Sequence, residues 1–293
     1  MPTQAQLKVF SPAKVNLYLN ILGKRADGYH ELETVMAPLD FGDEITLQLR
    51  KTGLVLECDN PNLPTDESNL AYRAAAALRA ATGIEKGVKI VLRKRIPLAA
   101  GLAGGSSNAA TVLTGLNRLW QAGASPEKLN ELAAGMGSDI NFFLAGSAAV
   151  CRGRGEQVEP VPCRLSATVL LINPGFGIPT PWAYRHWSPP LTASRPDVTL
   201  LRRGLAEDDL DAVARGLHNS LEAPCLRKFP VLRLLQDALR EQGAAGALMS
   251  GSGATVFGLF RDRAAAERAA QIVREQFGPS LWTQVTRIAG TAR

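Results

Sequence analysis

The chain contains 293 residues, of which 46% are hydrophobic and 20% are charged, and its formal net charge is +6. That length and composition are typical of a globular protein with one large or two ordinary domains. No apolar run reaches the ~20 residues that cross a bilayer, and the polar segment at residues 1–8 lacks the apolar core of a signal peptide. We therefore expect a cytoplasmic protein.

The positive charge permits binding of nucleic acid, but it equally permits binding of a small polyanion such as a nucleotide. Basic residues are spread along the chain apart from the run at 93–95, which is expected at a solvated strand end. The cysteines and histidines are scattered, which predicts thiols in a reducing compartment and argues against a zinc site. They are Cys58, Cys151, Cys163, Cys225, His30, His186 and His218.

The first half of the chain mixes strand and helix patterns. Alternation of apolar and polar residues predicts strands at 45–49 and 88–92. Between them, the alanine-rich segment at 68–81 is expected to form a helix that Gly83 ends. Apolar residues then recur every three or four positions over 109–120, which predicts one amphipathic helix.

The second half has a similar mixture. Two prolines between apolar runs mark a boundary at 156–164, and we divide the chain into domains at 1–160 and 161–293. An apolar strand at 167–172 is followed by a loop at 173–196 that is rich in Pro, Trp and Tyr. The remaining pattern predicts helices at 205–217, 230–239 and 262–277 and strands at 247–250, 255–260 and 283–289. Paired strands with interspersed helices are typical of an α+β fold.

The strongest motif is a run of small residues between the strand at 88–92 and the helix at 109–120. Small residues let a backbone approach a ligand closely, and the unpaired N–H groups at a helix N-terminus attract phosphate. Ser106 and Ser107 can add hydroxyl donors or a magnesium ligand, and either suits the helix N-cap. We expect a phosphate-binding loop; a tight turn that binds nothing is the weaker alternative. The run comprises Pro97, Leu98, Ala99, Ala100, Gly101, Leu102, Ala103, Gly104, Gly105, Ser106, Ser107 and Asn108.

This run does not fit the common nucleotide motifs. No Gly-Lys-Ser or Gly-Lys-Thr occurs in the chain, so a Walker A motif is excluded. The dinucleotide fingerprint Gly-x-Gly-x-x-Gly is also missing. A nucleotide site on this loop therefore belongs to another class.

A second motif, Ser-Pro-Ala-Lys-Val-Asn-Leu at 11–17, places two polar side chains in an otherwise apolar strand at 9–22. Strand alternation puts Lys14 and Asn16 on the same face. That face is either solvated, as is common for lysine, or part of a polar site.

Three further segments carry weaker signals. Asp139, in Gly-Ser-Asp-Ile-Asn-Phe-Phe at 137–143, is a carboxylate against an apolar run that either caps a short helix or takes part in chemistry. The turn Ser-Gly-Ser-Gly-Ala at 250–254 can contact a phosphate or a substrate through its backbone. The turn Asp-Gly-Tyr-His at 27–30 projects an aromatic ring and an imidazole, or is a plain turn with an exposed histidine.

In this order, the five segments resemble the GHMP kinases, a superfamily marked by a Pro-x-x-x-Gly-Leu-x-small-Ser-Ser loop and a C-terminal Gly-Ser-Gly loop. The resemblance covers about residues 10–260. It implies a two-domain α+β GHMP kinase fold, with a ribosomal S5-like N-terminal domain that contains a left-handed β-α-β unit. The implied C-terminal domain is ferredoxin-like. The Asp-Gly-Tyr-His block is similar to the corresponding segment of the family members that phosphorylate a cytidine diphosphate ester of methylerythritol.

The resemblance implies an activity as well. ATP, with Mg²⁺, would phosphorylate the 2-hydroxyl of this cytidine ester, giving the 2-phosphate and ADP, in non-mevalonate isoprenoid synthesis. The ATP phosphates would lie on the loop at 97–108. The implied partner is a small-molecule substrate rather than nucleic acid or a membrane. The resemblance assigns no magnesium ligand and no oligomeric state.

Residue roles follow from the same resemblance. Lys14 and Asp139 look like the catalytic pair: a carboxylate can accept the proton of a poorly nucleophilic alcohol, and an ammonium can keep that carboxylate ionised and stabilise the transferred phosphoryl group. His30 looks like the group that hydrogen-bonds the cytosine edge. The other implied substrate contacts are the aromatic partners Tyr29 and Tyr184, and Asn16.

Two positions depart from the family pattern. Ala99 replaces a glycine that is frequent in the phosphate loop, which is harmless if its φ is negative and damaging otherwise. Asn141 stands where proline is frequent. A GHMP kinase with another acceptor is the first alternative, and in it His30 and Tyr184 would be dispensable. An RNA-binding protein on a similar scaffold is the second, although the chain has no dense basic stripe.

Overall fold

The computed structural model describes residues 5–189 and 198–289, which form two compact units. Each unit draws on separate stretches of the chain, because the long strands β1 (Gln6–Lys24) and β2 (His30–Arg50) contribute residues to both. The first unit comprises Met1–Ala13, Gly42–Ile96 and Ala103–Gly146, and the second comprises Lys14–Phe41, Pro97–Leu102 and Ser147–Arg293.

The first unit contains a sheet with a β-α-β connection. β3 (Leu54–Cys58) pairs in parallel with β4 (Gly87–Arg93), and β4 pairs antiparallel with the end of β2. Parallel neighbours need a crossover, which α1 (Leu70–Thr82) provides. Asn69 caps the start of α1, and Gly83 ends it with a φ of 68°, which confirms the predicted helix and its stop.

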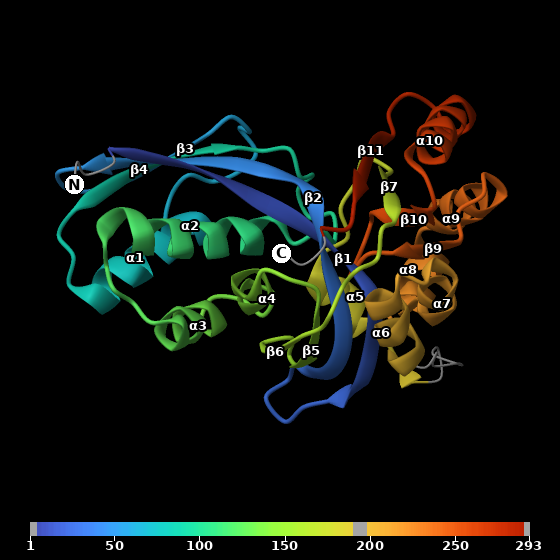
Figure 1. Ribbon diagram of the computed structural model, residues 1–293, viewed down its shortest axis with the longest axis horizontal. Coiled ribbons are helices and arrows are strands. Elements are labelled where there is room, and N and C mark those ends of the chain that lie inside the picture. Colours follow the sequence, from blue (N-terminus) through green and yellow to red (C-terminus); the bar gives the residue numbers. More distant parts are fainter. Residues whose placement is uncertain (1–4, 190–197, 290–293) are drawn as a thin grey trace. The chain divides into compact units, whose positions relative to one another are not determined.

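Helix α2 (Gly104–Trp120) packs beside α1, as Figure 1 shows. The predicted amphipathic helix is confirmed, but it begins earlier than expected, after Ala103 at the N-cap. The predicted N-cap at Ser106 or Ser107 is therefore wrong, because both serines lie inside the first turns of the helix. Burying aliphatic side chains stabilises such a unit by ~1.5–3 kcal/mol each; the core includes Ile45, Leu47, Leu78, Ile90, Leu113, Leu116 and Trp120.

Two short helices complete the first unit. α3 (Pro126–Ala134), which the apolar pattern missed, begins at the N-cap Ser125, whose side chain accepts the N–H of Lys128. α4 (Ile140–Ala145) follows Asp139 directly. The short helix expected after this carboxylate is thus confirmed.

The second unit contains a four-stranded antiparallel sheet in the order β11-β7-β10-β9. Counted along the chain, this order is 4-1-3-2, which is the ferredoxin-like arrangement that the family resemblance implies. Helices α9 (Val231–Glu241) and α10 (Arg263–Phe277) bury their apolar faces in the same core. The strands are β7 (Thr168–Asn173), β9 (Gly246–Met249), β10 (Val256–Phe260) and β11 (Trp282–Arg287).

Other elements of this unit differ from the predictions. The single helix expected at 205–217 is two helices, α6 (Val198–Glu207) and α7 (Leu210–Gly216), because Asp208 has a φ of 60° and Asp209 caps a new helix. The loop expected at 173–196 contains α5 (Thr180–Arg185), and its residues 190–196 lie outside the described residues. The unit also contains β5 (Ala149–Gly153), β6 (Gln157–Pro160), β8 (His218–Asn219) and α8 (Glu222–Lys228).

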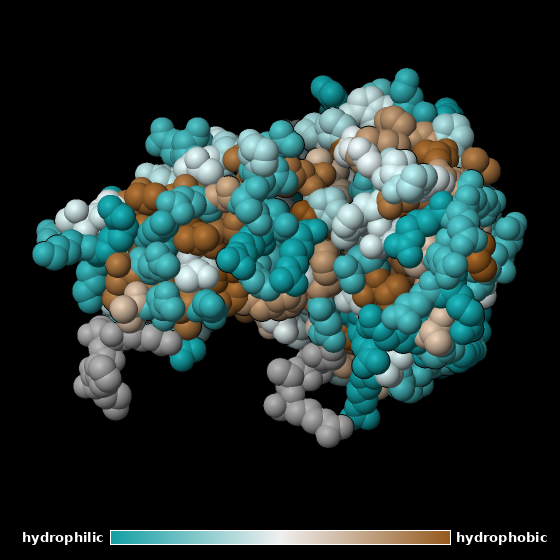
Figure 2. Space-filling model, turned by 90° about the horizontal axis from the view of Figure 1, so that it is seen from above, coloured by the Kyte–Doolittle hydropathy of each residue, from teal (hydrophilic) through white to brown (hydrophobic). Residues whose placement is uncertain are grey.

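The surface is polar with scattered apolar positions. On the face shown in Figure 2, teal hydrophilic side chains alternate with smaller brown areas. Single exposed apolar residues are normal in globular proteins. In the part of the chain that the structure describes, the large exposed ones are Phe10, Leu22, Tyr29, Leu98, Leu234 and Ile272. Within residues 5–189 and 198–289, no helix combines the length and apolar character needed to span a membrane. The four cysteines are free thiols, as predicted.

Candidate active site

The first half of the predicted phosphate-binding loop, residues 97–102, has a strained backbone. Ala99 has a φ of 50° and Gly101 a φ of 77°. Ala99 therefore adopts the left-handed conformation that costs a residue with a Cβ roughly 1–2 kcal/mol, and the harmless alternative of a negative φ is wrong. A Cβ on Gly101 would lie 2.1 Å from the carbonyl oxygen of Ser250. This position consequently requires glycine.

The turn at 250–254 supports this half of the loop. Ser250 Oγ donates to the Gly101 carbonyl at 3.0 Å, and the Thr255 N–H donates to the Ala100 carbonyl at 3.3 Å. Ser250 Oγ also accepts the backbone N–H of Asn16 at 3.3 Å. The two glycine-rich segments are thus joined by direct hydrogen bonds within the second unit.

Asn219, on β8, holds the same turn from another side. Its Nδ2 donates to the carbonyls of Met249 and Gly251, both at 2.8 Å, and its Oδ1 accepts the Leu221 N–H at 2.9 Å. Sequence analysis missed Asn219, because an isolated asparagine at the end of a two-residue strand carries no motif.

Lys14 and Asn16 lie together on one face of β1, as strand alternation predicts. Lys14 Nζ donates to Asn16 Oδ1 at 2.5 Å and to the Gly101 carbonyl at 3.0 Å. Lys14 and Asn16 are each only 3% exposed. The alternative of a solvated face is therefore wrong, and a buried ammonium of this kind depends on such hydrogen bonds.

Thr34, on β2, fixes the orientation of the Asn16 amide. Its hydroxyl accepts Asn16 Nδ2 at 2.9 Å and donates to the Tyr18 carbonyl at 2.6 Å. A hydroxyl has one proton to donate. The Thr34 hydroxyl donates it in the hydrogen bond to the Tyr18 carbonyl, because a carbonyl can only accept. Thr34 can therefore only accept from Asn16, so the amide must turn its Oδ1 toward Lys14. A threonine in a strand gives no sequence signal for this role.

The second half of the loop forms the first turns of α2 in the first unit. Ser106 is half-buried, whereas Ser107 is fully buried, and its hydroxyl shares a hydrogen bond of 2.8 Å with that of Ser11. The Asn108 amide donates to Ser11 Oγ and to Asp43 Oδ2, both at 2.9 Å. Of the polar side chains predicted to bind phosphate, only Ser106 is partly exposed.

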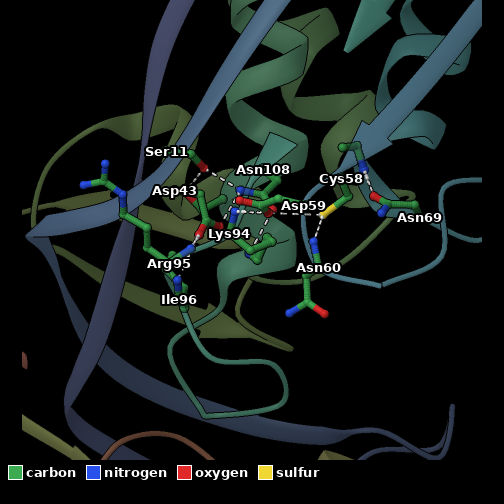
Figure 3. A network of polar contacts seen from close by, with 12 residues as sticks. Ser11, Asp43, Cys58, Asp59, Asn60, Asn69, Lys94, Arg95, Ile96 and Asn108 are labelled. Atoms are coloured by element: carbon green, nitrogen blue, oxygen red, sulfur yellow. Dashed lines mark hydrogen bonds and ion pairs between the residues drawn. The ribbon is translucent and has the colours of Figure 1, made fainter. Parts of the chain in front are cut away.

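The basic run before the loop divides into two environments. The Lys94 side chain is 4% exposed and forms an ion pair with the fully buried Asp43, as Figure 3 shows. The Arg95 side chain, in contrast, is 58% exposed and pairs with Glu44 at the surface. The prediction of a solvated strand end is thus wrong for Lys94, whose charge is neutralised in the interior.

Asp139 occupies the N-cap position of α4, with φ −84° and ψ −3°, but its carboxylate makes no capping hydrogen bond to the helix. The alternative that its side chain serves as a helix cap is therefore wrong. Asn141 holds the segment instead: its Nδ2 donates to the backbone carbonyl and the side-chain oxygen of Asn130, both at 2.9 Å. The departure from proline at this position thus ties α4 to α3.

His30 begins β2 and packs among aromatic rings of the second unit. Its ring centroid lies 5.2 Å from that of Tyr184 and 5.7 Å from that of Trp187. Burial, and to a smaller extent the charge of Lys24, lower the pKa of His30 below its ordinary value. At neutral pH the imidazole is therefore uncharged and has one donor and one acceptor nitrogen. The alternative of an exposed histidine on a plain turn is wrong.

Tyr29 is the outermost of the predicted aromatic residues and is 55% exposed. The guanidinium of Arg154 lies over its ring at 5.0 Å. The turn itself is confirmed: Asp27 accepts the Tyr29 N–H at 3.1 Å, and Arg25 N–H donates to the Tyr29 carbonyl at 2.8 Å. The structure thus brings His30 and Tyr184 together and places Tyr29 beside a cation.

Among the residues that the structure describes, no group of three or more His, Cys, Asp or Glu side chains is arranged to hold a metal ion.

The fold and the site have the features of a GHMP kinase. These features are a parallel β-α-β unit, a small-residue loop that leads into a long helix, and a Gly-Ser turn on a ferredoxin-like sheet. The sequence agrees: residues 69–147 match the GHMP kinases N terminal domain, and residues 201–278 match the GHMP kinases C terminal domain.

Relatives that match most of the chain show to which family of GHMP kinases it belongs. The 4-diphosphocytidyl-2-C-methyl-D-erythritol kinase of Synechococcus sp. (strain JA-3-3Ab) is 45% identical over 88% of this chain and 85% of its own. The kinase of the same name from Gloeobacter violaceus is 42% identical over 97% of this chain and 95% of its own. This chain therefore belongs to the 4-diphosphocytidyl-2-C-methyl-D-erythritol kinase family.

Solved structures agree with this assignment. A crystal structure of 4-(cytidine 5'-diphospho)-2C-methyl-D-erythritol kinase has a TM-score of 0.83 and 38% identity, covering 97% of this chain and 100% of that one. Homoserine kinase from Cytophaga hutchinsonii has a TM-score of 0.75 at 21% identity, covering 99% of this chain and 96% of that one, and shares the fold alone. The family assignment favours a kinase over the RNA-binding alternative.

Proposed function

We propose that this chain transfers the γ-phosphoryl group of ATP to the 2-hydroxyl of 4-diphosphocytidyl-2-C-methyl-D-erythritol, giving the 2-phosphate and ADP, in non-mevalonate isoprenoid biosynthesis. The observation that carries the proposal is the 42% identity to a kinase of that name over 97% of this chain. The proposal includes cytoplasmic action, Mg²⁺ as the companion of ATP, and a domain boundary at residue 160.

The proposed phosphate site is the loop at 97–108. Its fit to a nucleotide rests on the closely packed backbone around Gly101, on the half-buried Ser106, and on the unpaired N–H groups at the start of the 17-residue helix α2. ATP bound there would supply the phosphoryl group. Ala99 has a strained backbone conformation, and such strain is often found at sites that bind a ligand. This supports nucleotide binding by the loop.

Lys14 and Asp139 are proposed as the catalytic residues. Asp139 orients the acceptor hydroxyl and takes its proton, and its carboxylate is not used to cap α4. Lys14 presents a buried ammonium that can stabilise charge on the transferred phosphoryl group. Because phosphoryl transfer passes through a loose transition state, positioning and charge stabilisation matter more than strong basicity.

His30, Tyr184, Tyr29 and Asn16 are proposed to bind the acceptor. The neutral imidazole of His30 can both donate to and accept from the cytosine edge, and the adjacent Tyr184 ring offers a stacking surface. Tyr29 would contact the base or the ribose from the turn. The Asn16 Oδ1 accepts from Lys14 and one N–H of its Nδ2 donates to Thr34, so a substrate contact would use the second N–H or the remaining lone pair of Oδ1.

The first experiment measures ADP release from ATP and Mg²⁺ with 4-diphosphocytidyl-2-C-methyl-D-erythritol, mevalonate or homoserine as acceptor. We expect release with the cytidine substrate alone. Release with another alcohol would retain the kinase class and discard the cytosine site. No release with any acceptor would contradict the proposed function.

Replacing His30 with Leu is expected to raise KM for the cytidine substrate about 10- to 100-fold, because a polar edge of the base loses its partner at ~1–3 kcal/mol. KM for ATP should not change. In the wild type, KM for the cytidine substrate should rise below pH ~6.5, since protonation removes the acceptor nitrogen and burial keeps the pKa of His30 below that value.

The matched control is His186→Leu, which changes an exposed histidine at the C-cap of α5, directly after the helix. Its KM values should equal those of the wild type. An unchanged KM for the cytidine substrate in His30→Leu would remove His30 from the proposed site.

Replacing Thr34 with Val keeps the side-chain shape but removes the hydroxyl that accepts Asn16 Nδ2 and donates to the Tyr18 carbonyl. We expect urea unfolding to show a loss of ~1–3 kcal/mol. Steady-state kinetics should show a lower kcat, because Lys14 loses its fixed acceptor, with KM for ATP unchanged. Thr34→Ser retains the hydroxyl and should restore kcat. Equal kcat in Thr34→Val and the wild type would show that Asn16 does not need this orientation.

A further inference from the structure

A buried polar network lies in the first unit, and none of the proposed catalytic or substrate-binding residues belongs to it (Figure 3). Its members come from four elements or their ends: β1, β2, the residue after β4, and the start of α2. The side chain of each is almost fully buried, and each has a polar partner in the network. They are Ser11, Asp43, Lys94, Ser107 and Asn108.

Asp43 is the centre of this network. Its Oδ1 accepts the backbone N–H groups of Arg95 at 2.7 Å and Ile96 at 2.9 Å. Its Oδ2 accepts Asn108 Nδ2 at 2.9 Å and the ammonium of Lys94. A carboxylate offers about four lone-pair directions, so all of them are used. Removing this fully buried residue's charge would leave several donors without an acceptor.

The four donors lie at the two ends of one segment. Arg95 and Ile96 directly precede Pro97, where the phosphate-binding loop begins, and Asn108 is its last residue. A single carboxylate therefore holds the chain just before the loop and the helix turn at its end. Asp43 fixes the distance that the intervening residues must span.

Lys94 adds a second connection between the same two ends. Its Nζ donates to Asn108 Oδ1 at 3.2 Å as well as to Asp43. A Cβ on Gly104, the first residue of α2, would lie 3.1 Å from this Nζ, so glycine allows the ammonium to come this close. A positive charge at a helix N-terminus is unfavourable, and Asp43 compensates for it.

Ser11 completes the support beneath α2. Its Oγ is hydrogen-bonded to Ser107 Oγ and accepts the Asn108 amide. Ser107 and Asn108 thus direct their polar groups into the protein, away from any ligand on the exposed side of the loop.

We propose that Asp43 is a positioning residue for nucleotide binding: through Lys94, Asn108 and the backbone of residues 95 and 96, it sets the shape of the phosphate-binding loop. Ser107 and Asn108 act with it as supports, and Ser106 and the backbone N–H groups contact the phosphates. This inference rests on the proposed binding of ATP by residues 97–108.

The test compares Asp43→Asn with Glu44→Gln in the full chain. Glu44 is the adjacent carboxylate, and it forms a surface ion pair that contributes little. Calorimetry with ADP and Mg²⁺, without an acceptor, gives the nucleotide Kd, and steady-state kinetics give both KM values. We expect Asp43→Asn to raise the ADP Kd and KM for ATP about 10- to 100-fold, with KM for the cytidine substrate unchanged, and Glu44→Gln to match the wild type.

The outcomes separate this inference from the proposed function. Failure of the wild type to bind ADP would contradict the proposed nucleotide site itself. Wild-type affinity in folded Asp43→Asn, even with a lower Tm, would show that Asp43 is structural only and would overturn the inference. If Asp43→Asn does not fold, Ser11→Ala removes one hydroxyl from the support, and a nucleotide Kd equal to that of the wild type in this variant would also overturn it.

Discussion

Replacing Asp139 with Asn is expected to lower kcat by about 10²- to 10⁴-fold, the usual contribution of a general acid or base, while KM for ATP stays near the wild-type value. Asparagine has nearly the same shape but cannot accept the proton of the acceptor hydroxyl. The fold should be retained, because the carboxylate makes no capping bond to α4 and Asn141 holds the segment. Steady-state ADP release and a nucleotide Kd measure the two effects.

Asp209→Asn is the matched control. Asp209 also stands at a helix N-cap, but its carboxylate accepts the Ala212 N–H at 2.9 Å. Asparagine is a good N-cap as well, so this variant should keep both kcat and Tm. Full activity in Asp139→Asn would exclude Asp139 from the chemistry. A loss near the lower limit would indicate that Asp139 chiefly positions the hydroxyl, as a loose transition state allows.

Local sequence patterns predicted most elements of the fold, because the residues that begin and end a helix or strand lie in or next to that element. Gly83 ends α1 in the left-handed conformation that glycine adopts readily, and Asp262 caps α10 by accepting the Ala265 N–H. Alternation along β1 also placed Lys14 and Asn16 on one face. The ferredoxin-like order of the second sheet came from the family resemblance, since strand order depends on contacts between distant residues.

The parts that sequence analysis missed depend on partners far along the chain. Lys94 belongs to a basic run that predicts solvent exposure, and its buried partner Asp43 is 51 positions away. Thr34 lies 18 positions from Asn16, in a strand where threonine is unremarkable. The early start of α2 was missed because Ala103 adopts a φ of 55°, a conformation that alanine rarely takes outside a strained site.

Replacing Lys14 with Met is expected to lower kcat by about 10²- to 10³-fold, the effect of removing one preorganised charge-stabilising donor. Methionine fills similar volume, and it removes a buried ammonium whose desolvation is costly. The loss of two acceptor interactions, at Asn16 and Gly101, offsets that gain, so Tm should change little. Circular dichroism melting and ADP release under saturating substrates measure both quantities.

One further variant separates charge from geometry at this site, and a second serves as a control. Lys14→Arg keeps the charge, but its planar guanidinium cannot reproduce the two ammonium bonds in a buried space, so kcat should stay low. Lys89→Met removes a lysine of β4 that pairs with Glu57 and whose side chain is 30% exposed; its kcat should equal that of the wild type. If Lys14→Arg were fully active, positive charge alone would suffice for catalysis. The hydrogen bonds from Thr34 to Asn16 and from Asn16 to Lys14 would then have no role in it.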